Sequence, residues 1–180
     1  MSFTKISAAI AAIVLLSAGV QAQAAQLTDP QIAHVAYTAG NIDIKAAQLA
    51  LQKSKNKDVR TFATEMVRDH KAVNNKALAL LKKLKVTPED NETSKSLTAS
   101  ANERYAELKK LKGAEFDRSY ADNEVSYHAT VNGALQSTLI PSTTNAELKE
   151  LLQTGLKLFQ GHQAHADELV HTLKTQHARL

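Results

Sequence analysis

The 180-residue sequence has no cysteine and no tryptophan, and it contains only three prolines and six glycines. The absence of cysteine excludes disulfides, thiolate metal sites, thiol catalysis and a lipid-modified cysteine. Because there are only four phenylalanines and four tyrosines, a core must consist mostly of alanine, leucine, valine and isoleucine. This composition, with so few helix-breaking residues, favours long helices over sheets.

Strong charge of one sign is also missing. The formal net charge is +4, and no run of five or more like charges occurs along the chain. Such a pattern is typical of a solvated mixed surface and differs from the basic footprint of a nucleic-acid-binding protein. We therefore expect no nucleic-acid partner, whereas a homo-oligomer or a partner in the cell envelope stays open.

Residues 1–24 have the pattern of a secretory signal peptide. A lone Lys5 precedes an apolar run that ends at Val20, and the small-x-small sequence Ala-Gln-Ala ends at Ala24. The run is shorter than the roughly 20 residues that span hydrocarbon. We expect cleavage after Ala24, with Ala22 as the alternative. The mature chain, residues 25–180, would then be a periplasmic protein without a transmembrane segment.

The mature chain is predicted to form one all-α domain. Apolar residues recur at steps of three and four, which indicates amphipathic helices over residues 28–54, 58–84 and 115–139 and a fourth after the capping residue Asn145. Pro141 is expected to end the third helix. A more polar helix over residues 93–111 connects the two halves. Since the other connections are short, neighbours should be antiparallel. The prediction is an antiparallel four-helix bundle with an additional crossover helix.

Each of the four long helices carries one ionisable side chain near its middle, on an otherwise apolar stripe. These side chains are Asp43, His70, His128 and His162. Burying such groups without partners costs several kcal/mol. Four of them directed into one bundle interior therefore suggest that they bind something.

Positions along the helices test whether these residues lie at one level. Asp43 and His70 lie on opposite sides of the turn at Asn56 and almost equally far from it along the chain, which places the two level. His128 lies closer to the expected helix end at Leu139 than His162 lies to Asn145, where the next helix begins. At about 1.5 Å per residue, either this difference puts His162 roughly 9 Å out of level or the expected start of the fourth helix is misplaced.

Further polar neighbours share the same faces. Asp69 precedes His70, Glu124 lies one turn before His128, and Glu65 and His165 lie one turn from Asp69 and His162, respectively. Carboxylates and imidazoles inside a bundle are ligands of iron, manganese, zinc or copper. We predict a metal site at Asp43, His70, His128 and His162, with Asp69 or Glu124 as a further ligand or orienting group.

None of His70, His128 and His162 has a Glu three residues before it, as the Glu-x-x-His pattern of di-iron bundles requires, so a mononuclear site suits the residues at least as well. A local sequence echo links two of the histidines. The pattern V-x-x-H-x-x-V-N occurs over residues 67–74 and again over residues 125–132. Either chance or a shared role explains it.

Other interpretations of the same residues stay open. The histidines could be core residues that hydrogen-bond to carboxylates or tyrosines and fix the helix register of a non-enzymatic envelope protein. Alternatively, they could sense pH, because histidine titrates near neutrality. Tyr120 and Tyr127, on the inner side of the third helix, are interpreted mainly as packing. His34, His171 and His177 lack the pattern and are interpreted as surface residues.

Several strings resemble the DUF4142 family of exported bacterial proteins. They are the segment from Asp43 to Ala50, the segment from Asn56 to Ala63 that runs into Met-Val-x-Asp-His at residues 66–70, and the third-helix residues Phe116, Asp117, Tyr120, Val125 and His128. The resemblance covers residues 29–175. It implies a ferritin-like fold without an established activity, often labelled an outer-membrane protein, although the mature helices here are amphipathic.

The resemblance also implies which positions matter. The Asp-His pair of the family matches Asp69 and His70, and its last-helix histidine matches His162. Its third-helix residues match Asp117, Tyr120 and His128. The family has Glu where this chain has Asp43, which shortens the reach of that carboxylate by one methylene. The resulting hypothesis is a ferritin-like metal-binding protein with a redox or stress-related role.

Overall fold

The computed structural model describes residues 26–178, so the predicted signal peptide at residues 1–24 lies outside the described residues. Within residues 26–178 the chain is all-helical, as predicted, and has no strand. The elements are α1 (Asp29–Lys53), α2 (Lys57–Leu84), α3 (Glu92–Lys110), α4 (Gly113–Ala134), the π-helical turn η1 (Leu135–Leu139), α5 (Ile140–Ser142) and α6 (Ala146–His177).

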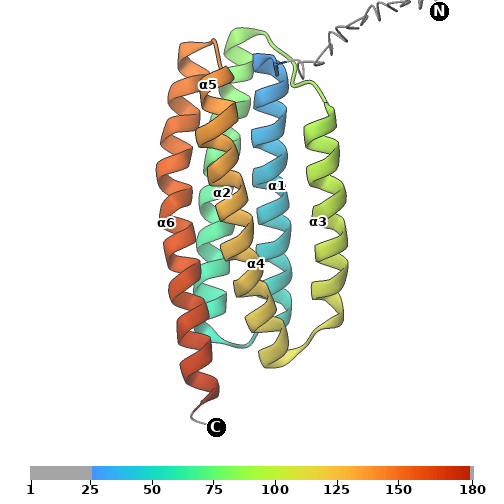
Figure 1. The fold of residues 1–180 in the computed structure, drawn as a ribbon, viewed down its shortest axis with the longest axis vertical. Helices are drawn as coiled ribbons and strands as arrows, with labels where there is room; N and C mark the ends of the chain where they lie inside the picture. Colours follow the sequence, from blue (N-terminus) through green and yellow to red (C-terminus); the bar gives the residue numbers. More distant parts are fainter. Residues whose placement is uncertain (1–25, 179–180) are drawn as a thin grey trace, which may run out of the picture.

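Four long helices pack side by side, and the fifth lies outside them (Figure 1). α1 packs against α2, α2 against α6, α6 against α4, and α4 against α1. The members of each of these pairs run in opposite directions (Figure 1). α3 lies along α1 and carries the chain from the end of α2 back to the opposite end, where α4 begins. α3 is therefore a crossover between two helical hairpins.

Capping residues start three of the long helices, among them the predicted cap Asn145. Thr28 and Gln31 form a capping box at the start of α1, with a proline in the first turn. The Asn56 side chain accepts hydrogen bonds from two backbone N–H groups of α2, and Asn145 Oδ1 accepts one from Leu148 at 2.9 Å. These caps fix where each helix begins, and so the level of every residue along it.

The predicted end of the third helix is wrong. The chain stays helical through Leu139 and Pro141 as far as Ser142. The N–H of Ile140 bonds to the carbonyl of Leu135 in a π turn, and the regular pattern resumes where Thr143 bonds to Leu139 at 3.1 Å. Pro141 lacks an N–H to donate, and the π turn just before it replaces the regular bonding at this point.

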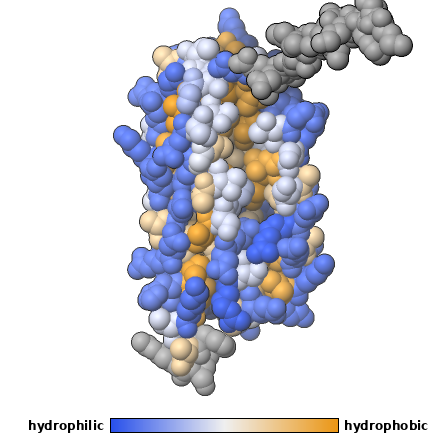
Figure 2. Space-filling view, in the orientation of Figure 1, coloured by the Kyte–Doolittle hydropathy of each residue, from blue (hydrophilic) through white to orange (hydrophobic). Residues whose placement is uncertain are grey.

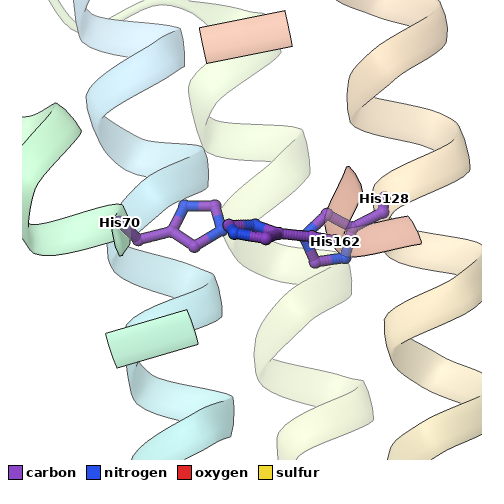
Figure 3. A group of neighbouring side chains, drawn as sticks. All are labelled: His70, His128 and His162. Carbon is purple, nitrogen blue, oxygen red and sulfur yellow. The ribbon is translucent and has the colours of Figure 1, made fainter. Parts of the chain in front are cut away.

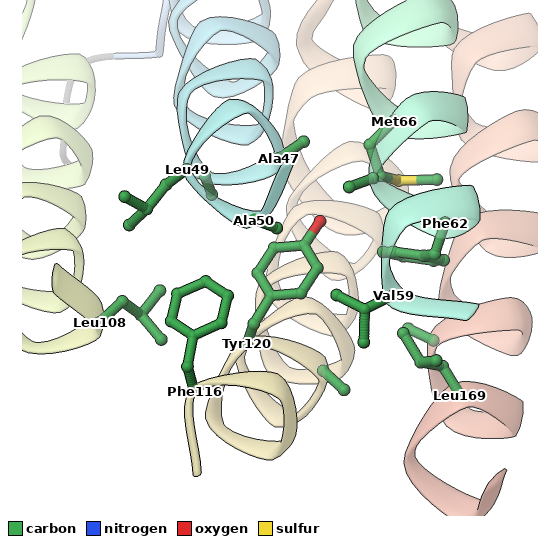
Figure 4. Packing of buried hydrophobic residues seen from close by; sticks show 14 of the residues in the cluster. Ala47, Leu49, Ala50, Val59, Phe62, Met66, Leu108, Phe116, Tyr120 and Leu169 are labelled. Atoms are coloured by element: carbon green, nitrogen blue, oxygen red, sulfur yellow. The ribbon is translucent and has the colours of Figure 1, made fainter. Parts of the chain in front are cut away.

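Two apolar clusters occupy the two ends of the helix packing. One contains most of the large buried side chains, with Tyr120 between Phe116 and the α2 residues Val59 and Phe62 (Figure 4). The other is mainly aliphatic and contains Ile32, Leu81, Leu135, Leu139, Leu148, Leu152 and Phe159. On each of α1, α2, α4 and α6, the polar residue near the middle separates the residues of one cluster from those of the other. In residues 26–178, no helix is long and apolar enough to cross a membrane.

Candidate metal centre

Three histidines from three helices meet at one level between the two apolar clusters. His70 of α2, His128 of α4 and His162 of α6 lie level with one another (Figure 3). Their ring centroids are 5.8 Å apart for His70 and His128, 5.3 Å for His70 and His162, and 5.5 Å for His128 and His162. The expectation that His162 lies out of level is therefore wrong, because the third helix continues past Leu139 and the count began from the wrong end.

Asp43 of α1 completes this layer from the fourth helix. Its Oδ2 lies 3.4 Å from His70 Nε2 and 3.4 Å from His128 Nε2. Neither contact has hydrogen-bond geometry. A tetrahedral ion with bonds of about 2.0–2.1 Å holds its ligand atoms roughly 3.3 Å apart. Each of the two spacings matches one edge of a tetrahedral coordination site, whereas the compact ligand group that contains Asp43 consists of Asp43, Glu124 and His128.

The orientation of His128 is fixed by its own helix. Its Nδ1 donates to the backbone carbonyl of Glu124 at 2.9 Å. Because this bond places the proton on Nδ1, the lone pair of Nε2 is directed at the Asp43 carboxyl group. The Glu124 side chain lies on the same side, with Oε2 3.7 Å from His128 Nδ1. Glu124 is fully buried.

His162 is held from the opposite direction by a carboxylate nearer the surface. Its Nε2 lies 3.1 Å from Asp69 Oδ2, and Asp69 in turn accepts two hydrogen bonds from Arg68, at 2.6 and 2.9 Å. His162 Nδ1 is left buried without a hydrogen-bond partner. A histidine whose outer nitrogen is bonded to a carboxylate is the usual arrangement of a metal-ligating imidazole.

The layer contains an unusual concentration of buried polar atoms without hydrogen-bond partners. They are Asp43 Oδ1 and Oδ2, His70 Nδ1 and Nε2, Glu124 Oε2, His128 Nε2 and His162 Nδ1. Folded proteins leave only a few such atoms per hundred residues, and each costs about 1–3 kcal/mol. Their concentration in one place makes the layer a candidate ligand site.

Burial holds these side chains in their neutral forms. Desolvation raises the pKa of Asp43 to about 7 and raises the pKa of Glu124 well above its usual range. The same cause lowers the pKa of His128 to about 4 and also lowers the pKa values of His70 and His162. Neutral imidazole is the form that binds metals. A cation in the layer would reverse the preference of the two carboxyl groups and ionise them.

The six predicted site residues fall into overlapping groups that could hold a metal ion. One group is His70, His128 and His162, and a second is Asp43, Glu124 and His128; within each, the candidate ligand atoms lie within 4.8 Å of one another. A third, partly exposed group adds Glu65 to Asp69 and His162. The structure thus brings all six residues together, with Asp69 at the outer edge.

Comparison with protein families gives one match, which covers most of the chain. The family model described as a domain of unknown function, DUF4142, matches residues 16–169. The chain belongs to the DUF4142 family. No curated protein and no solved structure matches it. Membership of DUF4142 assigns no activity, so a function must be argued from the geometry.

The DUF4142 resemblance singles out two further positions, Tyr120 and Asp117. They lie on the side of the layer nearer the apolar cluster that contains Phe62 and Phe116. Tyr120 is fully buried, and its hydroxyl has no hydrogen-bond partner. Burial raises the pKa of this hydroxyl well above its usual range, and the nearby Glu124 and Asp43 raise it further. Asp117 is also buried, with Oδ1 unpartnered. The polar region of this DUF4142 chain therefore extends along α4 for about two to three turns beyond His128.

Some contacts of the layer were missed by the sequence reasoning. Phe159 of α6 stacks on His70 with ring centroids 4.6 Å apart and planes inclined by 7°. Arg68 was not singled out, although its position beside Asp69 could have suggested the ion pair. Among the other histidines, His171 is exposed as predicted, whereas His34 is half-buried and lies 3.6 Å from Asp90.

The sequence echo corresponds to a similar arrangement in the two hairpins. The asparagine one turn after His70 is Asn74, and it donates to Asn41 Oδ1 of α1 at 3.0 Å. The asparagine one turn after His128 is Asn132, and it donates to Gln163 Oε1 of α6 at 2.9 Å. Each asparagine thus ties its own helix to the partner helix of the same hairpin.

Proposed function

We propose that this protein binds one divalent transition-metal ion through Asp43, His70, His128 and His162. The observation that carries the proposal is the set of buried, unpartnered ligand atoms, with Asp43 Oδ2 at 3.4 Å from two imidazole nitrogens. Three nitrogens and one carboxylate oxygen are a complete tetrahedral ligand set. Bound metal would give one buried atom of each of these four residues a partner.

Glu124 and Asp69 have supporting roles in this proposal. Glu124 supplies a second buried carboxyl group beside His128, and it would balance the charge of a divalent ion. Asp69 lies on the far side of His162 and would orient that ring without touching the ion. The mixed imidazole and carboxylate donors suit iron, manganese, zinc or copper.

The ferritin-like assignment and the cellular role belong to the same proposal. Ferritin-like bundles have one long crossover connection between two helical hairpins, and α3 makes such a connection here. The secretory pattern of residues 1–24 supports a periplasmic location. A metal-binding protein of this compartment would suit a stress-related role, such as keeping a reactive metal bound.

The alternative, a polar layer that only fixes helix register, is less well supported. Residues that fix register do so by pairing with one another. Here the Asp43 oxygens and both nitrogens of His70 have no hydrogen-bond partner. The layer is thus only partly paired, and its unpaired atoms lower stability without adding specificity. A bound metal would give Asp43 and His70 one partner each, which a role in register alone does not.

Metal uptake by the purified, demetallated protein tests the proposal. Titration with Fe²⁺, Mn²⁺, Zn²⁺ and Cu²⁺, read by calorimetry and elemental analysis, is expected to give one equivalent for at least one ion. His70→Gln should weaken this binding at least tenfold, because it removes a buried ligand. His171→Gln changes an exposed histidine of α6 and should bind as the wild type does. Absence of stoichiometric uptake, or unchanged uptake in His70→Gln, would refute the proposal.

A further inference from the structure

A cavity of about 170 Å³ adjoins the histidine layer on the side of the aliphatic cluster. Leucines of η1 and α6 line it, and His70, His128 and Phe159 close one end. Small residues from three helices leave the space: Ala33, Ala36, Gly40, Ala77 and Gly155. The cavity belongs to this half of the interior, because large side chains fill the cluster on the other side of the layer.

The chemistry of the walls determines what such a cavity would hold. Apart from the imidazoles, Asn74 and the residues at its mouth, the lining is aliphatic or aromatic. An apolar cavity of roughly 150 Å³ lined by such side chains stays dry and takes up benzene or xenon. Ordered water is disfavoured in a space of this kind because it needs two to four polar partners. A small apolar molecule therefore fits both the volume and the walls.

The π turn η1 lies directly on the cavity wall. Leu135 and Leu139, the first and last residues of η1, both line the cavity. π turns are rare and occur frequently at functional sites, because they widen a helix at one point. The π turn that follows α4 thus lies beside both the cavity and the imidazoles.

A surface groove leads to the cavity. The groove lies between α3 and the helices α1 and α4, and its lining includes apolar residues that appear as orange patches between α4 and α3 (Figure 2). Five residues line both the groove and the cavity: Tyr37, Thr93, Leu97, Tyr127 and Thr130. At this boundary the hydroxyl of Tyr127 donates to the carbonyl of Ala39 at 2.8 Å and joins α4 to α1. A small molecule would enter beside this contact.

We propose that this cavity is a binding site for a small apolar molecule, up to about the size of benzene, which lies against His70 and His128 and enters from the groove under α3. The site does not depend on a bound metal, because its walls are made by side chains of the apolar cluster. If the layer does bind a metal, the molecule would lie next to it.

Xenon and benzene are suitable probes for the metal-free protein. The wild type is expected to show a saturable xenon-dependent shift of the methyl resonances of Leu135 and Leu152, and benzene should raise the melting temperature. Ala77→Leu fills the cavity from α2 and should abolish both responses. Ala33→Leu fills it from the α1 side and should also abolish both responses. Agreement between the two variants excludes misfolding of a single variant as the cause.

Ala79→Leu is the matched control, because it adds the same side chain to an exposed position of α2 and should leave both responses unchanged. A wild type with no saturable response would overturn the proposal, as would filled variants that respond like the wild type. Metal uptake measured on the same samples separates the two proposals. Loss of the xenon response with intact metal uptake removes only the cavity site, and the reverse result removes only the metal site.

Discussion

Asp43 is the residue on which the polar layer depends. It is almost fully buried, it contacts two imidazoles from two other helices, and it comes from a helix that contributes no histidine to the layer. Because an aspartate side chain is one methylene shorter than a glutamate side chain, Asp43 reaches the imidazoles only where α1 lies close to α2 and α4. Its chemistry is therefore sensitive to the spacing of the helices.

The raised pKa of Asp43 predicts a pH dependence in the metal-free protein. Folded Asp43, with a pKa of about 7, retains a proton that the unfolded chain loses near 3.8. The contribution of Asp43 to stability is thus complete below pH 3.8 and is lost as pH rises towards 7. The free energy of unfolding of the wild type, relative to Asp43→Asn, should fall by up to about 4 kcal/mol over this window.

Urea denaturation of both proteins at pH 4.5 and pH 7 measures this difference. The lowered pKa values of the three histidines act in the opposite direction, but they are present in both proteins and largely cancel in the comparison. With saturating metal the sign should reverse, since a cation keeps Asp43 ionised in the folded state. An equal difference at both pH values in metal-free protein would contradict the protonated form of Asp43.

The close approach of α1 to α2 depends on the small size of Gly40. Gly40 of α1 faces the side chain of Asn74 of α2 so closely that an added Cβ would meet the amide. Asn74 also donates to Asn41 and contacts the carbonyl of Tyr37. The close approach of α1 to α2, which brings Asp43 to His70, therefore requires a glycine at this position.

Gly40→Ala is predicted to destabilise the fold by about 1–3 kcal/mol through overpacking, although alanine is the better helix former. The matched control is Gly133→Ala in α4, where an added Cβ meets nothing within 4 Å. That variant should gain about 0.5–1 kcal/mol. Thermal or urea denaturation measures both changes. A stabilised Gly40→Ala protein would show that the two helices can separate without cost.

The sequence predicted the helices well but not where the third one ends. The cap at Asn145 and the turn at Asn56 could be predicted because such residues act through local hydrogen bonds of their side chains with the backbone. Pro141 indicated an end because proline breaks regular hydrogen bonding. A π turn depends on how Leu135 and Leu139 pack against other helices, and no local pattern announces it. The error shifted the predicted level of His162.

At the scale of the whole molecule, metal binding should appear as thermal stability. A ligand at 100 times its dissociation constant adds about 2.7 kcal/mol to a folded state that alone binds it. For a domain of this size, the melting temperature should rise by roughly 5–10 °C. His70→Gln should lose this rise and His171→Gln should keep it. Equal shifts in both variants would indicate binding elsewhere.

The predicted residues of the candidate site came together because helical periodicity and short hairpins fix which residues face inward and at which level. Asp43 and His70 illustrate this, since the count from Asn56 placed them level. The cavity could not be predicted in the same way. Its volume depends on distances between helices, which Ala77 and Gly155 permit but do not determine. Whether metal is bound stays a prediction for the same reason, since it depends on energies rather than on pattern.

His162 reaches both the buried layer and the edge of the protein. One ring nitrogen is buried without a partner and the other lies 3.1 Å from the partly exposed Asp69. An imidazole can take up a proton at one nitrogen and release one from the other. Metal binding must expel the protons held by Asp43 and Glu124. Until metal occupies His162 Nδ1, this ring connects the layer to the partly exposed Asp69, so the residue that would hold the metal also lies on a path by which those protons can leave.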